Sequence, residues 1–377
     1  MKIVVAIDSF KGSMSSLEAG KAAENGIRRV LPEAEVVIKP IADGGEGTVD
    51  ALAIGMGGEL KTVTVTGPLG APVDATYGVV GTTAIMEMAA SSGLALIKRE
   101  ERAPLDATTY GVGEMIRDAI LKGCRRFIIG IGGSATNDGG LGMLQALGFS
   151  FLDQEGKEVP FGAKALSMIH TICDDKAMPE LSECEFNIAC DVNNPLCGEL
   201  GATTIYGPQK GVTPEQVAVI DAAMAQYGKL SCTKYPQADM NLPGAGAAGG
   251  LGFAFLTYLK AELKSGIGLI LNEIGLEDTV RDADLVITGE GRMDHQTAMG
   301  KVPVGIAKLA KQYHLPVLGF AGCVMRDTNA VNACGIDAFF PITRTPCTLD
   351  EAMDIENAMA NMADCVEQAI RLWTIGK

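Results

Sequence analysis

Residues 130–140 of this 377-residue chain read GIGGSATNDGG and directly follow the apolar run FII at 127–129. Five of the eleven residues are glycine, and the polar ones are one serine, one threonine, one asparagine and one aspartate. Glycine lets backbone N–H groups approach a ligand, and a helix starting near Gly139 would add partial positive charge. We therefore expect a phosphate- or carboxylate-binding loop formed by Gly132, Gly133, Ser134, Asn137 and Asp138. The alternative is a tight turn in which Asn137 and Asp138 only cap a helix, but such a turn requires fewer glycines.

Polar side chains also follow four other apolar runs that suit buried strands. These side chains are Asp8, Ser9 and Lys11; Asp43 and Glu46; Asp191, Asn193 and Asn194; and Glu290, Arg292 and Asp294. In open parallel sheets the ligand binds outside the carboxyl ends of the strands, so these positions can converge on one cleft. Any one of the carboxylates can instead cap a helix or contact solvent, but a chance placement of all of them at strand ends is less credible.

A cleft rich in acids and glycines, with a few lysines and little histidine, suits phosphoryl transfer. Carboxylates would hold Mg²⁺, backbone N–H groups and lysines would offset phosphate charge, and one carboxylate could accept the hydroxyl proton. The candidate cations are Lys11, Lys210 and Lys301, each of which could equally be a solvated surface lysine. The kinase motifs G-x-x-x-x-G-K-[ST] and H-R-D are absent from the chain.

Composition excludes several classes of protein. The formal net charge of −15 argues against nucleic acid or an anionic membrane surface as a partner. No apolar run approaches the roughly 18 residues that span a bilayer, and the start, MKIVVAIDSF, has too few apolar residues for a signal peptide. The ten cysteines contain no C-x-x-C pair, so we expect reduced thiols in a cytoplasmic protein and no structural zinc. The oligomeric state stays open, with a homo-oligomer among the alternatives.

The order of the expected elements predicts an α/β fold. Two strands near the start and three near the end supply one open, doubly wound parallel sheet; they are KIVVAI (2–7), EVVIKPI (35–41), DLVIT (284–288), PVLGF (316–320) and DAFFPI (337–342). The segment between them opens with an alternating pattern at 61–80, typical of an antiparallel hairpin, and continues with further strands. We therefore expect residues 1–60 plus 283–377 to form one domain, and 61–282 to form a second α/β domain inserted into it.

A series of short motifs runs through nearly the whole chain in one order. They are DSFKGSMS (8–15), ADGGEGT (42–48), GPLGAPV (67–73), TTYGVGE (108–114), IGIGGSATNDGG (129–140), CDVNNPLCG (190–198), GPQKG (207–211), PGAGAAGGLG (243–252) and TGEGRMDHQT (288–297). With these motifs the sequence closely resembles the type I bacterial glycerate kinases (glycerate 2-kinase). The resemblance implies a flavodoxin-like domain interrupted by a second α/β domain. It also implies ATP-dependent phosphorylation of D-glycerate in glyoxylate or sugar-acid catabolism, with 2-phosphoglycerate the expected product and 3-phosphoglycerate left open.

Roles within the site are assigned from chemistry. The expected catalytic residues are Asp43 as the first choice of base, Asp191 as the second, and Asp8 with Lys11. The expected substrate-binding residues are Ser9, Lys11 and Lys210. Lys301 is expected to bind phosphate together with the glycine-rich loop, and Glu290 with Asp294 are the expected Mg²⁺ ligands because hard oxygen atoms are what that ion prefers.

Two other classes of protein use similar elements. An NAD(P)-dependent hydroxy-acid dehydrogenase could be built on the same kind of sheet, although the first strand is followed by DSFKGS and not by G-x-G-x-x-G. A non-enzymatic binding protein for a small acid would bind glycerate and never consume ATP. An assay of ADP release with a panel of hydroxy acids separates these alternatives from a kinase.

Overall fold

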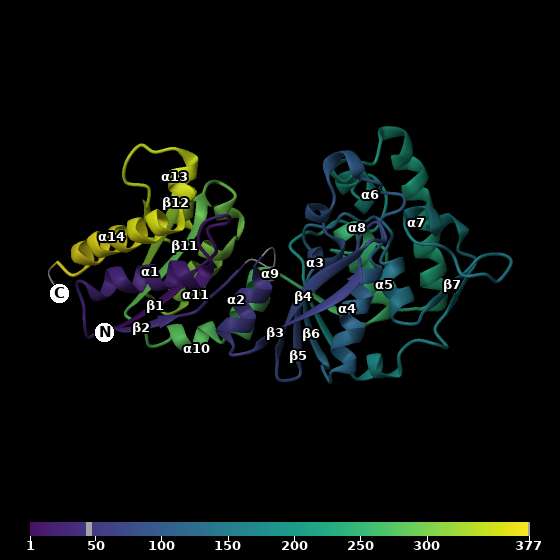
Figure 1. The fold of residues 1–377 in the computed structure, drawn as a ribbon, viewed down its shortest axis with the longest axis horizontal. Helices are drawn as coiled ribbons and strands as arrows, with labels where there is room; N and C mark the ends of the chain where they lie inside the picture. The colour runs from purple at the N-terminus through teal and green to yellow at the C-terminus, as the bar shows by residue number, and fades with distance from the viewer. Residues whose placement is uncertain (43–46, 376–377) are drawn as a thin grey trace. The chain divides into compact units, whose positions relative to one another are not determined.

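The computed structural model describes residues 1–42 and 47–375, which form a mixed α/β protein (Figure 1). Asp43 and Glu46 lie outside the described residues. The chain divides into two compact units, and the second is inserted into the first. Of the described residues, the first unit contains 1–42, 50–57 and 267–375, and the second contains 47–49 and 58–266.

The first unit is built on a parallel sheet of five strands. In spatial order they are β13 (Ala338–Pro341), β12 (Val317–Val324), β11 (Leu285–Met293), β1 (Lys2–Ile7) and β2 (Glu35–Ile38). Counted along the chain within this unit, the order is 2-1-3-4-5, which is one of the two common orders of doubly wound sheets. Each of the five apolar runs identified in the sequence overlaps one of these strands. The central strands β1 and β11 are largely buried, as expected for strands covered on both faces, while the edge strands β2 and β13 are only partly buried.

Strand β11 is longer than the sequence predicts. Glu290 pairs in register with Ala321 of β12, and Arg292 pairs with Cys323, so both side chains stand on the strand and not on a loop after it. A β-carbon on Gly289 would lie 2.2 Å from Phe320 O, which shows that this glycine permits close packing between the strands. The expected strand at 284–288 therefore continues to Met293, and the loop begins only at Asp294.

Helices cover the sheet of the first unit. They are α1 (Ser16–Arg28), α2 (Thr48–Gly55), α9 (Gly266–Glu273), α10 (Leu276–Val280), α11 (Val302–Gln312), α12 (Ala330–Ala333), α13 (Leu349–Met353) and α14 (Ile355–Trp373). Ser15 begins α1 with a capping box to Glu18. Helices α1 and α14 lie side by side (Figure 1), and a β-carbon on Gly26 would be 2.3 Å from Ala363 O.

Helices α9 and α10 belong to the first unit, although the expected boundary at residue 283 assigns them to the inserted domain. Ile267 of α9 packs against Gly305 of α11, where a β-carbon would meet its Cγ1 at 2.5 Å. Tyr313 Oη donates a hydrogen bond of 2.5 Å to Glu277 Oε1 of α10. The chain therefore enters the first unit again at Ile267.

The second unit contains a mixed sheet of six strands. In spatial order they are β10 (Glu262–Lys264), β9 (Glu185–Ala189), β6 (Arg126–Gly130), β5 (Thr83–Glu87), β4 (Pro72–Val80) and β3 (Glu59–Thr66). Strands β5, β6, β9 and β10 are parallel, while β3 and β4 form the antiparallel hairpin that the alternating pattern predicts. A separate antiparallel pair joins β7 (Ser150–Leu152) and β8 (Thr171–Cys173).

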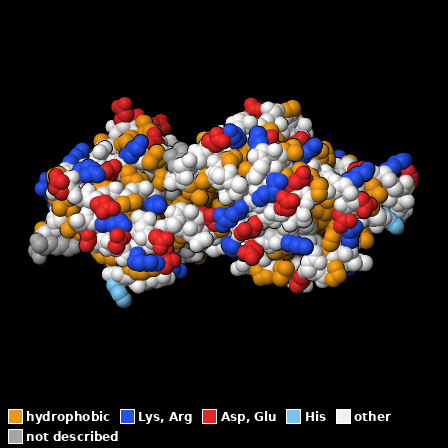
Figure 2. Space-filling view, turned by 90° about the horizontal axis from the view of Figure 1, so that it is seen from below, with side chains coloured by type: hydrophobic (Ala, Val, Ile, Leu, Met, Phe, Trp, Pro, Cys, Tyr) orange, Lys and Arg blue, Asp and Glu red, His pale blue; other side chains and the backbone are white. Residues whose placement is uncertain are grey.

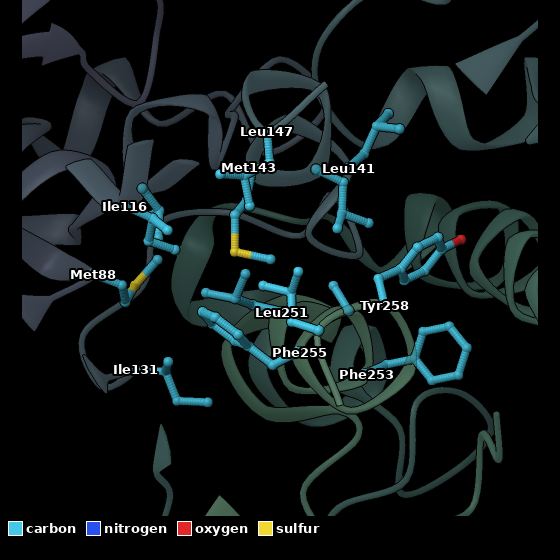
Figure 3. Packing of buried hydrophobic residues seen from close by; sticks show 14 of the residues in the cluster. Met88, Ile116, Ile131, Leu141, Met143, Leu147, Leu251, Phe253, Phe255 and Tyr258 are labelled. Atoms are coloured by element: carbon cyan, nitrogen blue, oxygen red, sulfur yellow. The ribbon is translucent and has the colours of Figure 1, made fainter. Parts of the chain in front are cut away.

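One large hydrophobic core holds the second unit together (Figure 3). The helices of this unit are α3 (Ala89–Ser92), α4 (Tyr110–Leu121), α5 (Leu141–Ala146), α6 (Ala202–Tyr206), α7 (Pro214–Lys234) and α8 (Ala247–Tyr258). Ile131 and Leu141, at the two ends of the glycine-rich loop, are both buried in this core with Leu251 and Phe255 of α8. The loop is therefore anchored on both sides.

Among the residues that the structure describes, no helix is long and apolar enough to cross a bilayer. Figure 2 shows basic and acidic side chains interspersed over the visible face, in keeping with a chain of net charge −15.

Candidate functional site

A cavity of about 390 Å³ opens in the first unit at the carboxyl ends of β1, β11 and β12. Its charged and polar lining residues include Asp8, Ser9, Lys11, Glu290, Arg292 and Lys301. Its apolar lining residues are Phe10, Ile342, Leu349, Ala352, Met353 and Ala358. Five of the residues expected to act in the site, Asp8, Ser9, Lys11, Glu290 and Lys301, therefore lie around one cavity, where the topology of a doubly wound sheet places a ligand.

The turn after β1 presents Asp8, Ser9 and Lys11 to this cavity. Asp8 N donates to Gly289 O of β11 at 2.9 Å, and the nearly buried Asp8 carboxylate accepts from Ser9 N at 2.7 Å. Phe10 and Met14 then pair through two backbone hydrogen bonds, which close the loop before α1. The exposed Lys11 lies in the turn between these two paired residues.

Glu290 is the second buried acid of the cavity. Its Oε1 accepts a hydrogen bond of 2.5 Å from Thr297 Oγ1, and its Oε2 lies 3.7 Å from Lys301 Nζ. Burial raises the pKa of the Glu290 carboxyl, while the hydrogen bond from Thr297 and the charge of Lys301 lower it in part. Asp294 lies just beyond the strand, where Oδ1 accepts from Gln296 N at 2.9 Å and Oδ2 is 3.3 Å from Arg292 Nε.

Several lining residues were not identified from the sequence. Thr343 follows β13 and donates to Gly322 O at 2.7 Å, and Cys323 stands near the end of β12. The rule that polar residues at strand ends face the ligand could have found both. Asn361, in the middle of α14, offered no such signal, because nothing in a helical pattern marks which polar residue faces a cavity.

The glycine-rich loop of the second unit is built around a fully buried carboxylate. Asp138 Oδ2 accepts hydrogen bonds from Thr109 N, Thr109 Oγ1 and Gly142 N at 2.9, 2.9 and 3.2 Å, and Oδ1 accepts from Gly140 N at 3.1 Å. Burial raises the pKa of the Asp138 carboxyl, and these four hydrogen bonds oppose that shift. Asn137 is also buried, and its Nδ2 donates to Thr203 Oγ1 at 2.8 Å. These contacts give both side chains a role in holding the loop.

Lys210 makes hydrogen bonds to the same loop. Its side chain is only 2% exposed, and its Nζ donates to Ser134 Oγ at 2.7 Å and to Thr136 O at 2.6 Å. Burial lowers the pKa of the Lys210 ammonium to about 7, and the charge of Asp138 opposes this shift. Lys210 therefore fixes the position of residues 134–136.

Only one end of the loop presents free backbone. Gly132 and Gly133 are exposed, and a β-carbon on Gly132 would meet nothing within 4 Å. The backbone N–H groups of Gly132, Gly133 and Ser134 donate no hydrogen bond to a backbone oxygen of residues 1–42 or 47–375. Three successive amides of this kind can bind an anion without a helix dipole.

The other end of the loop differs from the expectation. Helix α5 begins only at Leu141 and has six residues, so it does not supply the charge of a long helix near Gly139. Gly139 and Gly140 have positive φ, and β-carbons there would collide with Tyr227 at 2.8 Å and Ala254 at 2.4 Å. These two glycines are required by chain conformation and close packing, not by a ligand.

The remaining predicted residues follow β9, which ends at Ala189. Asp191 is exposed, and its Oδ1 accepts a hydrogen bond of 2.9 Å from Gly266 N. Asn194 donates to Leu200 O at 2.8 Å and accepts from Tyr206 Oη at 2.7 Å, which shapes the loop that follows. The predicted site residues thus fall into two groups, one on each unit, apart from those at 43–46.

The shifted pKa of Lys210 predicts a pH-dependent stability. An unfolded lysine titrates near 10.4, whereas in the folded protein the pKa of Lys210 is about 7. Between these values the unfolded chain binds more protons at this position than the folded chain, so the free energy of unfolding rises with pH. The Lys210→Met variant lacks this rise. In urea denaturation, the stability of the native protein relative to Lys210→Met should therefore increase from pH 7 to pH 9.5.

The matched control is Lys98→Met, since the Lys98 side chain is 74% exposed. Its stability should follow that of the native protein at each pH. Parallel pH profiles for the native protein and Lys210→Met would show that Lys210 keeps an ordinary pKa in its buried position.

Comparisons with known proteins are in accord with one another. The model of the glycerate kinase family matches residues 3–374. The chain is 48% identical to a glycerate kinase of Bacillus subtilis over 98% of its own length and 96% of the relative's. It is 47% identical to the glycerate 2-kinase of Escherichia coli, with 93% of each chain covered. A crystal structure assigned as glycerate kinase 2 from Salmonella typhimurium has a TM-score of 0.92 and 43% identity, covering 100% of this chain and 99% of the other.

Proposed function

The chain belongs to the glycerate kinase family of phosphotransferases, and we propose that it uses ATP to phosphorylate D-glycerate on its 2-hydroxyl. The product would be 2-phosphoglycerate, and the reaction would serve glyoxylate or sugar-acid catabolism. The observation that carries this proposal is the cavity of the first unit, where two buried acids and three basic side chains meet at strand ends. Phosphoryl transfer depends mainly on such positioning and on charge stabilisation.

The reaction requires a proton acceptor as well as anion-binding groups. The glycerate hydroxyl forms a bond to the γ-phosphorus, the bond from that phosphorus to the leaving oxygen of ADP breaks, and a base takes the hydroxyl proton. Asp43 is the proposed base, and Asp191 is the alternative. The amides of residues 132–134 are proposed to bind the carboxylate of glycerate or a phosphate, since they offer three donors at an exposed glycine turn.

Magnesium is part of this proposal, and the acids of the cavity fit it in part. Mg²⁺ is usually held by one or two carboxylates together with substrate phosphates, and when bound it offsets phosphate charge. Glu290 lines the cavity and could provide one such carboxylate. Asp294 fits less well, because both of its oxygens already face donors on neighbouring residues. Within the described residues there is no cluster of three or more His, Cys, Asp or Glu suited to a metal ion.

Neutralising Glu290 should raise the demand for metal. In Glu290→Gln the side chain keeps its size and can still accept from Thr297, but it loses the charge that attracts Mg²⁺. The Mg²⁺ concentration for half-maximal rate should rise several-fold at saturating ATP and glycerate, measured by titrating MgCl₂. Asp294→Asn provides the comparison, and a smaller rise is expected there. An unchanged Mg²⁺ requirement in both variants would place the metal elsewhere, with Asp191 the next candidate.

One experiment tests the function as a whole. ADP release is measured with ATP and a panel of hydroxy acids, and the product is identified by its phosphorus NMR spectrum. D-glycerate should be the preferred acceptor, with 2-phosphoglycerate as product, and formation of 3-phosphoglycerate would correct the position of transfer. Turnover of NAD(P)H would instead indicate a dehydrogenase, and glycerate binding without ADP release would indicate a binding protein.

The same proposal places the protein in the cytoplasm as an enzyme for small molecules. All ten cysteines are free thiols, which fits a reducing compartment. Glycerate and ATP are the partners proposed.

A further inference from the structure

The cavity of the first unit is too large and too apolar for glycerate alone. Its volume is about 390 Å³, within the range of pockets that hold ligands of drug size. Glycerate has three carbons that carry two hydroxyls and a carboxylate, so it offers almost no apolar surface. Six apolar residues share this cavity with the charged side chains, so the lining suits a ligand with both an anionic end and an apolar body.

The apolar wall is formed by three parts of the unit. Phe10 and Ile342 are buried at its base, and Ala358 presents its methyl group from α14. Met353 packs so closely on the first turn that a β-carbon on Gly12 would lie 2.7 Å from its Cε. Leu349 stands at the rim and is 75% exposed. Covering an exposed leucine side chain with a flat apolar group of a ligand removes apolar surface from water and so favours binding.

The charged residues of the cavity suit a chain of phosphates. Lys11, Arg292 and Lys301 line the cavity, and all three remain accessible to solvent. Asp8 and Glu290 are the acids among them, and Glu290 already accepts from Thr297. Lysine and arginine side chains bind phosphate oxygens through charge-assisted hydrogen bonds, and an acid between them can contact a phosphate-bound cation.

We propose that this cavity is the nucleoside triphosphate site of the protein. The base and ribose lie on the wall formed by Phe10, Ile342, Leu349, Met353 and Ala358, and the phosphates point to Lys11, Arg292 and Lys301. Asn361 stands one turn after Ala358 on α14, and its amide can both donate to and accept from the edge of a base. This inference rests on the proposed function, because it assumes that the phosphoryl donor is a nucleotide.

Photolabelling locates the site without a measurement of turnover. The full chain is irradiated with 8-azido-ATP and Mg²⁺, digested, and the labelled peptide is identified by mass spectrometry. The label should fall within residues 8–13 or 342–361 and should be removed by excess ATP but not by glycerate. A label within 130–140 or 202–211 of the second unit overturns the proposal.

Two variants test the apolar wall by affinity. Ala352→Trp fills the cavity from its partly exposed edge, and Leu349→Ser removes the apolar rim without disturbing buried packing. Binding of N-methylanthraniloyl-ATP, followed by fluorescence, should weaken at least about tenfold in Ala352→Trp and severalfold in Leu349→Ser. The KM for ATP should rise in parallel, with the KM for glycerate changed less than about twofold.

The matched control is Leu372→Ser, since Leu372 is 64% exposed on the same unit but outside the cavity. It should bind the fluorescent nucleotide as the native protein does. Native affinity in both cavity variants, while the native enzyme turns over ATP and glycerate, overturns the nucleotide site and leaves the function standing. Failure of the native protein to use any nucleotide as donor overturns the function, and the site with it.

Discussion

Replacing Gly132 by valine should lower kcat/KM by about 100-fold or more while leaving the protein folded. The β-carbon of residue 132 would point into open space, so the variant meets no steric obstacle in the folded chain. The added side chain would, however, cover the place where the amides of residues 132–134 meet an anion. Loss of a single such donor costs about 10²- to 10³-fold in other enzymes, and valine would block several. Gly132→Ala should show the same effect in smaller measure.

A valine at Gly133 should abolish turnover, but the cause is less direct. Gly133 has φ +72°, a conformation that a β-branched residue rarely adopts, so the variant also strains the backbone. Gly156 is the control, because its φ is +77° and a β-carbon there would meet nothing within 4 Å, while one on Gly133 would make only an ordinary contact with Ala89 at 3.5 Å. Gly156→Val should therefore reproduce the loss of stability and keep full activity.

Steady-state kinetics and a thermal unfolding curve for each variant decide the question. We expect unchanged unfolding for Gly132→Val, a lower melting temperature for Gly133→Val and Gly156→Val, and a loss of activity only at 132 and 133. Native kinetics in Gly132→Val would show that this loop binds no substrate and is only a turn between β6 and α5.

Most strands of the two larger sheets could be predicted from the sequence because they carry a strong signal, whereas the three-residue strand β10 could not. A strand buried on both faces, such as β1 or β11, needs an unbroken apolar run, and a half-exposed hairpin such as β3 and β4 needs alternation. The end of β11 could not be predicted in the same way. Glycines normally suggest a loop, but Gly289 and Gly291 remain in the strand, because β12 continues to pair alongside them.

The glycine-rich loop shows why composition alone overstates a site. Two of its five glycines, Gly139 and Gly140, are needed because Tyr227 and Ala254 pack against the backbone from distant helices. The turn at 248–250 also has positive φ and backs onto the loop, where a β-carbon on Gly249 would lie 2.1 Å from Thr136 O. Such long-range contacts leave no local pattern in the sequence.

The role of individual polar residues was harder still to predict. Lys210 looks like any surface lysine in the motif GPQKG, yet its ammonium group is buried beneath Ser134 and Thr136. Strand ends identified five residues of the cavity correctly as neighbours, because the topology of a parallel sheet brings its carboxyl ends together. Four of the six apolar lining residues stand on α13 and α14, whose packing on the sheet cannot be read from their own patterns.

Replacing Asp43 by asparagine should lower kcat by about 100-fold or more, with the KM for glycerate little changed. Removal of a general base has an effect of this size, and the amide preserves size and polarity while it can no longer accept a proton. Asp43 lies outside the described residues, so the prediction rests on its place in ADGGEGT, where four glycine or small residues would let a substrate approach. Initial rates at saturating ATP, measured over a range of glycerate concentrations, separate kcat from KM.

Asp191→Asn is the decisive comparison for the base. In the second unit Asp191 Oδ1 accepts from Gly266 N, and the oxygen of asparagine can make the same hydrogen bond, so the variant should fold normally. We expect Asp191→Asn to keep a kcat within about threefold of the native value, because the Asp191 carboxylate is expected to hold the backbone and not to take the proton. Loss of the general base would lower kcat by far more than threefold. A near-normal kcat in Asp43→Asn together with a roughly 100-fold loss of kcat in Asp191→Asn would identify Asp191 as the base. In Asp191→Asn the hydrogen bond from Gly266 N is kept, so such a loss would come from the missing proton acceptor.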